Sequence, residues 1–524
     1  MRVRVAIIRV FLFAGSLLLV ASLPRAQEQI PDDEVTHETL KFTQIYGVLE
    51  QNFMEPLDPD RAVFDGGIRG MLSALDPFSN FFDPEQFEQL KQFTQGKARG
   101  FGSVLYVSAG KILVLQTAEG SPARRAGLGP GDEIVEVNGT RIDRLDIRSL
   151  IELLQRARSQ KAKLGVIRPG KVVSEDFELS PADVPNPTVD RAFLLKPGVA
   201  FLHVSAFDQK TPIEVNEAIS KLGGAALKGA LLDLRDNHGG VLDAAVALAS
   251  LFLKPGSIVL TQRGRAVPPQ QHVTVEAPAH YDFPLVLLVN GNTASAAEVF
   301  AAALQEHDRA VVAGEPSYGK GVVESVSALS GETGLALTTA QYFTPSGRSI
   351  QRPLPGTALA VPDKGLSDNP QPEFHTDNGR PVAAGGGITP DVELQALERD
   401  PWVTFLEQRG AFTSFASDYL TLRGKVAQDS EPDAKVLGDF RTFLERQRVR
   451  VPEEYWKADQ DYLKLRIKIE LFSLVFGLEY GEEVETRNDP QVQKAAALFA
   501  RIPALLQPPA AHRPVRVRPK FSTR

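Results

Sequence analysis

The chain has 524 residues, of which 43% are apolar and 23% charged, and its formal net charge is −7. This length exceeds what one hydrophobic core organises and predicts roughly two to four domains. The composition is that of a soluble globular protein, and the negative net charge gives no reason to expect a nucleic-acid partner. Because the chain has no cysteine, a cysteine nucleophile, a cysteine-ligated zinc site and a disulfide framework are excluded.

The N-terminus predicts an export signal over residues 1–26. Arg2, Arg4 and Arg9 precede a short apolar run, Val10–Val20. The run is short for a membrane span, but no clear cleavage site follows it, so an uncleaved anchor stays open. We therefore expect an exported protein of the bacterial periplasm, bound to the inner membrane only if the segment is retained.

The next two regions differ in periodicity. Residues 28–95 predict helices, with apolar residues near helical spacing at Leu40, Ile45, Val48, Leu49 and Phe53. Residues 96–180 predict short strands between glycine turns, with one helix at Ile147–Ala157. We expect an N-terminal helical region followed by a small β-rich domain.

Residues 181–397 alternate strands and helices, which predicts βαβ units and a mainly parallel sheet. The expected strands are Val199–Val204, Ala230–Leu234, Leu285–Val289 and Ala310–Ala313, and the expected helices are Glu214–Leu222, Val241–Leu253 and Ser295–Gln305. Residues 398–505 predict a helical C-terminal extension, and the basic, proline-rich residues 506–524 predict a disordered tail. The fold class is therefore multidomain α/β.

Within the β-rich domain, the run Ala126–Gly139 resembles the central signature of PDZ domains. Upstream, Arg99-Gly100-Phe101-Gly102 resembles their carboxylate-binding loop. Glycines let successive backbone amides converge on a terminal carboxylate, while the adjacent strand edge pairs with an extended peptide. Gly100, Phe101 and Gly102 are therefore the expected binding site for a substrate tail.

Two strand ends in the alternating region carry motifs suited to acyl chemistry. The run Leu232–Gly240 leads an apolar strand into a polar turn ending in Gly239 and Gly240, whose amides suit an anion. The run Val289–Glu298 leads a second strand through small residues to Ser295 at a helix start, a placement that exposes a nucleophile. Each motif alone also has a plain interpretation, as a βα turn or a helix cap.

Lys320 lies between two glycines in the run Ser317–Glu324. A lone lysine is ordinarily a solvated surface residue. A serine hydroxyl, however, needs a base to become nucleophilic, and a lysine serves as that base where burial keeps its amine neutral.

Taken together, these runs resemble the carboxyl-terminal processing proteases, also called tail-specific proteases. The likeness covers roughly residues 35–395 and includes three further runs, Leu75–Ser79, Tyr342–Gln351 and Gly387–Val392. It implies a PDZ domain inserted before a βαβ-type, crotonase-like protease core, with the 28–95 region packed on that core. It implies that Ser295 is the nucleophile and Lys320 the general base, with the amides of Gly239, Gly240 and Ala296 as the oxyanion hole.

The resemblance also implies the reaction. A protein substrate with a free C-terminus docks on the PDZ domain and is cut near that end, and neither a metal nor a cofactor is needed. Residues 398–505 carry apolar stripes, which suggest that this extension serves homo-oligomerisation or binds an adaptor partner.

Three residues depart from the family pattern. Glu324 stands where a glutamine usually orients the lysine, and an ionised carboxylate there favours the charged amine. His238 stands where proline is common, and we expect a simple loop residue. Phe78 replaces a usual histidine, and we expect it to alter packing only.

Other functions stay open. Glu324 prompts the alternative of a PDZ-type tail-binding adaptor with a silent or weakly active core. A Ser-His-Asp hydrolase lacks support, because no Gly-x-Ser-x-Gly elbow surrounds Ser295. An acyl-CoA enzyme of the crotonase type would need neither a PDZ domain nor an export signal.

Overall fold

The computed structural model describes residues 32–360 and 373–507, apart from residues 109, 159, 398 and 425, with side chains from residue 35 onward. The expected export segment 1–26 and nearly all of the expected tail 506–524 lie outside this part. Among the helices described, none combines the length and the apolar character that a membrane crossing requires.

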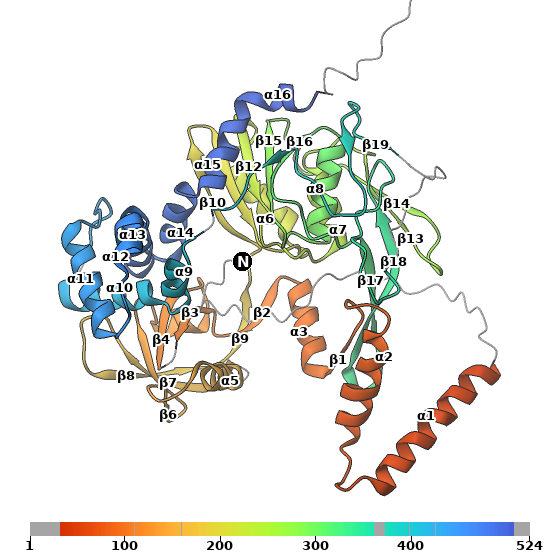
Figure 1. Ribbon diagram of the computed structural model, residues 1–524, viewed down its shortest axis with the longest axis horizontal. Coiled ribbons are helices and arrows are strands. Elements are labelled where there is room, and N and C mark those ends of the chain that lie inside the picture. Colours follow the sequence, from red (N-terminus) through yellow and green to blue (C-terminus); the bar gives the residue numbers. More distant parts are fainter. Residues whose placement is uncertain are drawn as a thin grey trace, which may run out of the picture.

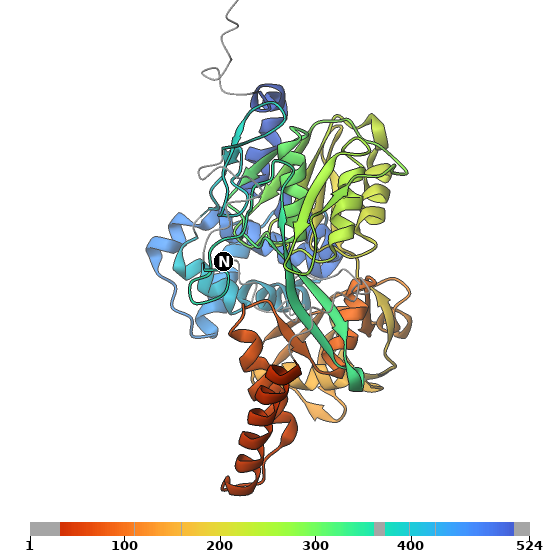
Figure 2. The same ribbon diagram turned by 90° about the vertical axis from the view of Figure 1, so that its right-hand side faces the viewer.

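The N-terminal region is helical, as predicted, but its first helix stands away from the body (Figure 1, Figure 2). Its elements are α1 (Asp32–Asn52), η1 (Asp60–Ile68), α2 (Arg69–Ser73), β1 (Asn80–Phe82) and α3 (Pro84–Thr94). The apolar side chains of α1 are exposed, Ile45 by 62%. The region is tied to the core by β1, which pairs with β18 (Gly334–Phe343).

Residues 103–179 form a sheet in the order β3-β4-β5-β7-β8, with β6 on β5. The elements are β3 (Ser103–Ser108), β4 (Lys111–Thr117), α4 (Pro122–Ala126), β5 (Glu133–Val137), β6 (Thr140–Arg141), α5 (Ile147–Arg158), β7 (Ala162–Ile167) and β8 (Ser174–Leu179). The chain enters and leaves this domain through a two-stranded ladder of β2 (Lys97–Gly100) and β9 (Ala182–Pro185). The edge strand β3 directly follows the Gly100–Gly102 loop.

The core is a six-stranded sheet in the order β10-β11-β12-β15-β16-β21, parallel from β11 onward. Its strands are β10 (Val189–Lys196), β11 (Val199–Val204), β12 (Gly229–Asp233), β15 (Leu285–Val289), β16 (Ala310–Gly314) and β21 (Val392–Glu393). The four central strands are buried on both faces, which explains why they read as continuous apolar runs.

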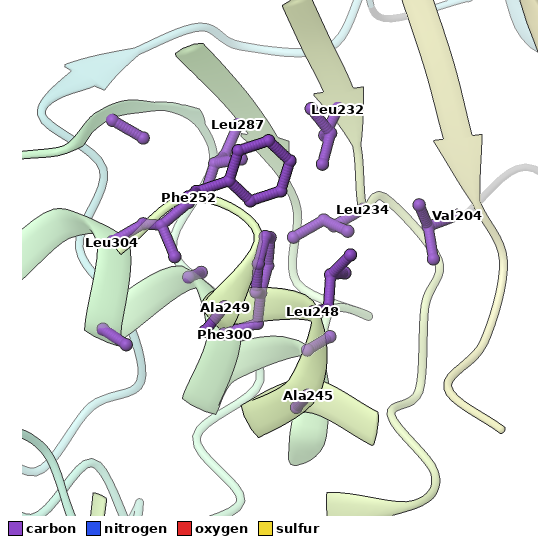
Figure 3. Close-up of a cluster of buried hydrophobic side chains, with 14 of the residues drawn as sticks. Val204, Leu232, Leu234, Ala245, Leu248, Ala249, Phe252, Leu287, Phe300 and Leu304 are labelled. Atoms are coloured by element: carbon purple, nitrogen blue, oxygen red, sulfur yellow. The ribbon is translucent and has the colours of Figure 1, made fainter. Parts of the chain in front are cut away.

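One face of this sheet packs against α6 (Thr211–Leu222), α7 (Leu242–Ser250) and α8 (Ala296–Glu306). Figure 3 shows the contact, where Phe252 and Phe300 meet Leu232 and Leu287 from neighbouring strands. Both βα turns that carry the candidate site leave the carboxyl ends of β12 and β15, which are adjacent in the sheet. The site is therefore built on a rigid layer.

A second, antiparallel sheet lies beside the core, with strands β1, β13 (Ile258–Arg263), β14 (Gln270–Val273), β17 (Val322–Ala328) and β18. The strands β17 and β18 form a hairpin whose start carries Val322, two residues after Lys320. A small hairpin, β19 (Phe374–His375) with β20 (Pro381–Val382), follows.

The C-terminal extension is helical, as predicted, and it packs against both the β3–β8 sheet and the core sheet. Its elements are α9 (Pro401–Gln408), α10 (Ala411–Arg423), α11 (Ala434–Arg446), α12 (Glu453–Ala458), α13 (Gln460–Phe476), α14 (Leu478–Arg487), α15 (Pro490–Ala497), η4 (Leu498–Arg501) and α16 (Ile502–Leu505). Helices α15 and α16 cover the second face of the core sheet, while α9 to α14 share one hydrophobic cluster with the β3–β8 domain (Figure 1).

Candidate active site

Ser295 lies at the start of α8, directly after the turn that leaves β15. Its backbone has φ 56° and ψ −122°, a conformation that residues with a side chain rarely adopt, and the residue is 6% exposed. Strain of this kind persists only where the surroundings enforce it, and it concentrates at functional sites.

The surroundings that enforce it are two interlocked turns. The Thr293 hydroxyl donates to the carbonyl of Leu234 at 2.8 Å, and the Ala294 amide donates to the carbonyl of Asn237 at 2.9 Å. The turn after β12 therefore fixes the turn that carries Ser295.

Gly239 and Gly240 occupy places where no side chain fits. A Cβ on Gly239 would lie 2.8 Å from Cβ of Ser295 and 2.9 Å from the amide nitrogen of Ala296. A Cβ on Gly240 would lie 2.0 Å from the carbonyl oxygen of Phe207. The glycine turn thus lies against Ser295, but the Gly239 amide already donates to Oδ1 of Asn237 at 2.8 Å.

Lys320 is buried, with 4% of its surface exposed, in the loop between β16 and β17. Its Nζ lies 2.6 Å from Oε1 of Glu324, whose side chain is also buried. The Glu324 carboxylate therefore faces the Lys320 amine.

Phe78 contradicts the expectation that it alters packing only. Nζ of Lys320 lies 4.3 Å from the centroid of the Phe78 ring, within the range of a cation–π contact. The Phe78 amide donates to Oδ1 of Asp76 at 2.7 Å, which fixes the backbone at this residue. The Lys320 amine therefore has an aromatic face and a carboxylate as close partners.

One buried carboxylate joins the Ser295 segment to the Lys320 segment. Glu298 accepts hydrogen bonds from the amides of Ser295 (2.8 Å), Gly319 (2.7 Å) and Lys320 (2.9 Å), and from the hydroxyl of Ser317. Burial raises the pKa of Glu298 to about 7, although these four donors act to lower it.

Tyr342 makes a second bridge. Its hydroxyl contacts the carbonyl oxygens of both Ser295 and Lys320, the former at 3.2 Å. Burial, and after it the carboxylates of Glu298 and Glu324, raise the pKa of Tyr342 well above its usual value. The hydroxyl therefore stays protonated and can donate.

Sequence reasoning placed Glu298 and Tyr342 inside the recognised motifs but assigned neither a role. A signal was available for Glu298, because Ser295-Ala-Ala-Glu298 has the spacing of a capping box. For Tyr342 no local pattern exists, since its partners lie 22 and 47 residues away along the chain.

Three further observations describe the surroundings of the site. In residues 32–360 and 373–507, no three or more His, Cys, Asp or Glu side chains are grouped to hold a metal ion. His238 is exposed on the glycine turn. A cavity of about 280 Å³, lined by Gly291, Tyr318, Arg352 and Leu354 among others, opens beside the Lys320 loop.

The loop that the sequence predicts to bind a substrate tail is tight. Gly100 ends β2, and Phe101 is half-buried. Gly102 has φ 69°, and a Cβ there would lie 2.4 Å from Cβ of Ser121. The free edge of β3 follows directly, so an extended peptide could add to this sheet with its terminus at the loop.

Comparisons with known proteins agree with this arrangement. The model of peptidase family S41 matches residues 198–358, and a PDZ-domain model matches residues 113–168. A carboxyl-terminal-processing protease of Synechocystis sp. is 33% identical over 65% of this chain and 83% of its own length. A carboxy-terminal-processing protease of Bartonella bacilliformis is 31% identical over 65% of this chain and 80% of its own length.

A solved structure, that of a photosystem II D1 C-terminal processing protease, is 26% identical, with a TM-score of 0.37 over 70% of this chain and 90% of that chain. On the extent and identity of the sequence matches, this chain belongs to the carboxyl-terminal processing proteases, serine peptidases of family S41 that carry a PDZ domain.

Proposed function

We propose that Ser295 is the nucleophile of this serine protease and that Lys320 is its general base. The observation that carries the proposal is the shared anchor: the Glu298 carboxylate binds the amides of both residues, and the Tyr342 hydroxyl contacts both of their carbonyls. Because the same two side chains hold both segments, the nucleophile and its base keep fixed relative positions.

In the proposed reaction, the neutral Lys320 amine takes the proton of the Ser295 hydroxyl as its oxygen attacks the scissile carbonyl carbon. The tetrahedral intermediate collapses to an acyl-enzyme, and Lys320 returns the proton to the leaving amine. Water, deprotonated by the same amine, then hydrolyses the ester and restores Ser295.

The oxyanion would form against the amides of Ala296, Gly239 and Gly240. The Ala296 amide nitrogen lies close to Gly239, because a Cβ placed on that glycine would be 2.9 Å from it. Because the Gly239 amide donates to Asn237, its use requires the Asn237 side chain to release it. Preorganised donors at this position supply much of the rate enhancement in acyl transfer.

Glu324 takes part by restraining the base. Its carboxylate lies 2.6 Å from the amine, and the two buried side chains form an ion pair that limits the movement of the amine. A silent adaptor is the alternative, and the processing-protease relatives do not favour it.

The substrates we infer are proteins with free C-termini. The tail would add to β3, with its carboxylate at Gly100, Phe101 and Gly102, and the chain would then reach Ser295. The crotonase-like description of the core, export to the periplasm and an oligomeric or adaptor role of the extension remain predictions. The residue ranges of the domains are likewise proposals, although the sheets of residues 103–179 and 189–393 agree with them.

The test uses the purified full chain and two peptides of one sequence, one with a free C-terminus and one amidated. We expect cleavage of the free-tailed peptide, weaker cleavage of the amidated one, and none by Ser295→Ala. Equal inertness of wild type and Ser295→Ala at every pH would leave the adaptor function. Equal cleavage of both peptides would contradict docking of the tail carboxylate, but it would leave the proposed catalytic residues in place.

A further inference from the structure

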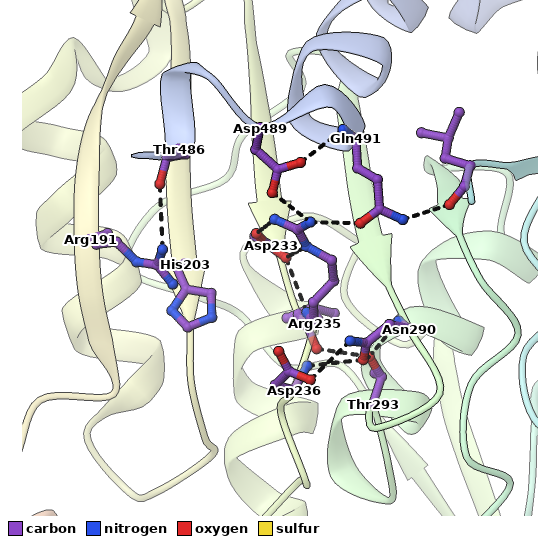
Figure 4. A network of polar contacts seen from close by, with 12 residues as sticks. Arg191, His203, Asp233, Arg235, Asp236, Asn290, Thr293, Thr486, Asp489 and Gln491 are labelled. Atoms are coloured by element: carbon purple, nitrogen blue, oxygen red, sulfur yellow. Dashed lines mark hydrogen bonds and ion pairs between the residues drawn. The ribbon is translucent and has the colours of Figure 1, made fainter. Parts of the chain in front are cut away.

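Arg235 connects the turn that leads to Gly239 with the C-terminal extension by hydrogen bonds (Figure 4). Its Nε and Nη2 donate to the two carboxylate oxygens of Asp233, at 2.9 and 2.6 Å. Its Nη1 donates to Oδ2 of Asp489 at 2.9 Å and to Oε1 of Gln491 at 2.8 Å. One planar guanidinium thus joins the end of β12 to the start of α15.

Asp233, Asp489 and Gln491 are buried, and only 11% of the Arg235 side chain is exposed, so these groups pair mainly with one another. Burial acts to raise the pKa of Asp233, but the Arg235 guanidinium outweighs it and lowers this pKa to about 2. Removing one member of a buried ionic group leaves the others uncompensated, which is costly. The arginine therefore has one strongly preferred position, set in part by the extension.

From Arg235 the path to Ser295 is short and rigid. The next residue, Asp236, has φ 61°, and its Oδ1 accepts from the side-chain amides of Asn290 (2.9 Å) and Asn292 (2.8 Å). Asn290 and Asn292 belong to the turn that ends at Ser295. A shift of Arg235 consequently moves both the glycine turn and the serine turn.

Resting on the proposed function, we infer that Asp489 and Gln491 are positioning residues of the reaction, which hold Arg235 and through it the Asp236–Gly240 turn against Ser295. These two residues lie outside both family matches, in an extension to which nothing else assigns a catalytic part. They touch no reacting atom and act only through the arginine.

The same extension also holds the tail-binding domain. Gln116 of β4 donates to Glu479 at the start of α14 at 3.0 Å, and the Tyr106 hydroxyl of β3 donates to the carbonyl of Gly410 at 3.0 Å. Helix α14 has 10 residues and spans about 15 Å. It therefore runs from the PDZ sheet to within two residues of Asp489.

The test compares Asp489→Asn with Glu483→Gln in the full chain. Asparagine removes the charge toward Arg235 and still caps α15, where Oδ1 of Asp489 now accepts the Gln491 amide at 2.8 Å. Glu483 pairs with Arg487 on the outside of α14, so its substitution is a matched loss of one acidic group in the extension.

We expect Asp489→Asn to lower kcat about tenfold with KM changed less than twofold, on both a tailed peptide and one too short to reach the PDZ domain. Affinity for a peptide aldehyde, which adds to Ser295 as a tetrahedral mimic, should fall by the same factor. Glu483→Gln should leave all three unchanged. A structural defect alone would lower the active fraction without changing aldehyde affinity.

Gln491→Met provides a second variant that keeps the Asp489 cap, should Asp489→Asn not fold, and we expect the same pattern at a smaller size. Unchanged kcat and aldehyde affinity in a folded variant of either kind would overturn the inference. That failure is distinct from failure of the proposed function, which would show as an inert wild type.

Discussion

Nζ of Lys320 lies 2.6 Å from Oε1 of Glu324, and both side chains are buried. The same amine lies 4.3 Å from the centroid of the Phe78 ring. The proposed general base therefore has two close partners, a buried carboxylate and an aromatic face.

Glu324→Gln should make the enzyme more active at neutral pH. The amide keeps the shape of the side chain but removes the negative charge that pairs with Lys320. A buried ion pair then no longer restrains the amine, and we expect kcat/KM to rise about tenfold. Steady-state assays at about pH 7 measure it.

The exposed Glu332→Gln is the matched control and should leave kcat/KM unchanged. An unchanged kcat/KM in Glu324→Gln would show that the Glu324 carboxylate does not restrain the amine.

The stability of the folded protein should depend on pH through Glu298. Burial raises its pKa to about 7 from an ordinary 4.5, so the folded protein holds a proton that the unfolded chain releases. Its contribution to stability is fully present below about pH 4.5 and is lost as pH rises through about 7. The Glu298 carboxylate accepts from backbone amides, among them that of Lys320, and it acts on Tyr342. Glu324, which also acts on Tyr342, pairs with the Lys320 amine.

Urea denaturation of wild type and Glu298→Gln at several pH values tests this. The free energy of unfolding of the wild type should decline relative to the variant across that window. We also expect kcat to fall at least tenfold in Glu298→Gln, because an amide accepts fewer of the four donors. A parallel pH dependence in both proteins would contradict the shifted pKa.

Gly102→Ala should weaken tail recognition without changing the rate of the catalytic step. With φ 69° and only 2.4 Å from the new Cβ to Cβ of Ser121, the loop has to move. We expect KM for a free-tailed peptide to rise about tenfold, by the loss of roughly 1.4 kcal/mol of binding, with kcat nearly unchanged. Gly129→Ala, where the space is open, is the control in the same domain. A fall in kcat alone would argue against docking at this loop.

Removing residues 399–524 should unfold the protein rather than release an intact smaller enzyme. Without α15 and α16, the sheet face that contains Phe201, Leu231, Val286 and Leu288 loses its cover. A milder variant, Leu498→Ala, should lower the free energy of unfolding by about 2–4 kcal/mol, whereas the exposed Leu422→Ala should change it by less than about 0.5 kcal/mol. Circular dichroism and thermal denaturation decide, and a truncated chain with native stability would refute the role of the extension.

The elements that local pattern specifies were predictable. The strands Val199–Val204 and Leu285–Val289 have the bounds expected from the sequence, because strands buried on both faces read as uninterrupted apolar runs. The helix beginning after Ser295 was expected within one residue, since small residues and a buried strand precede it.

What depends on distant pairing was not predictable. The apolar spacing of α1 predicts a packed helix face, yet that face is exposed, because spacing says nothing of what covers it. The contact of Tyr106 with Gly410 joins residues 304 apart, and that of Arg235 with Asp489 joins residues 254 apart. No local pattern encodes such pairs, so the sequence predicted a helical extension but not its contacts with both domains.

The central claim is that the Ser295 hydroxyl attacks only when the Lys320 amine can take its proton. The direct measurement is mass-spectrometric mapping of the residue modified by a fluorophosphonate, with rates taken for wild type, Lys320→Ala and Ser295→Ala. The account predicts modification at Ser295 in the wild type, a rate at least a hundredfold lower in Lys320→Ala, and none in Ser295→Ala. Modification of another residue, or an equal rate at Ser295 without the lysine, would contradict it.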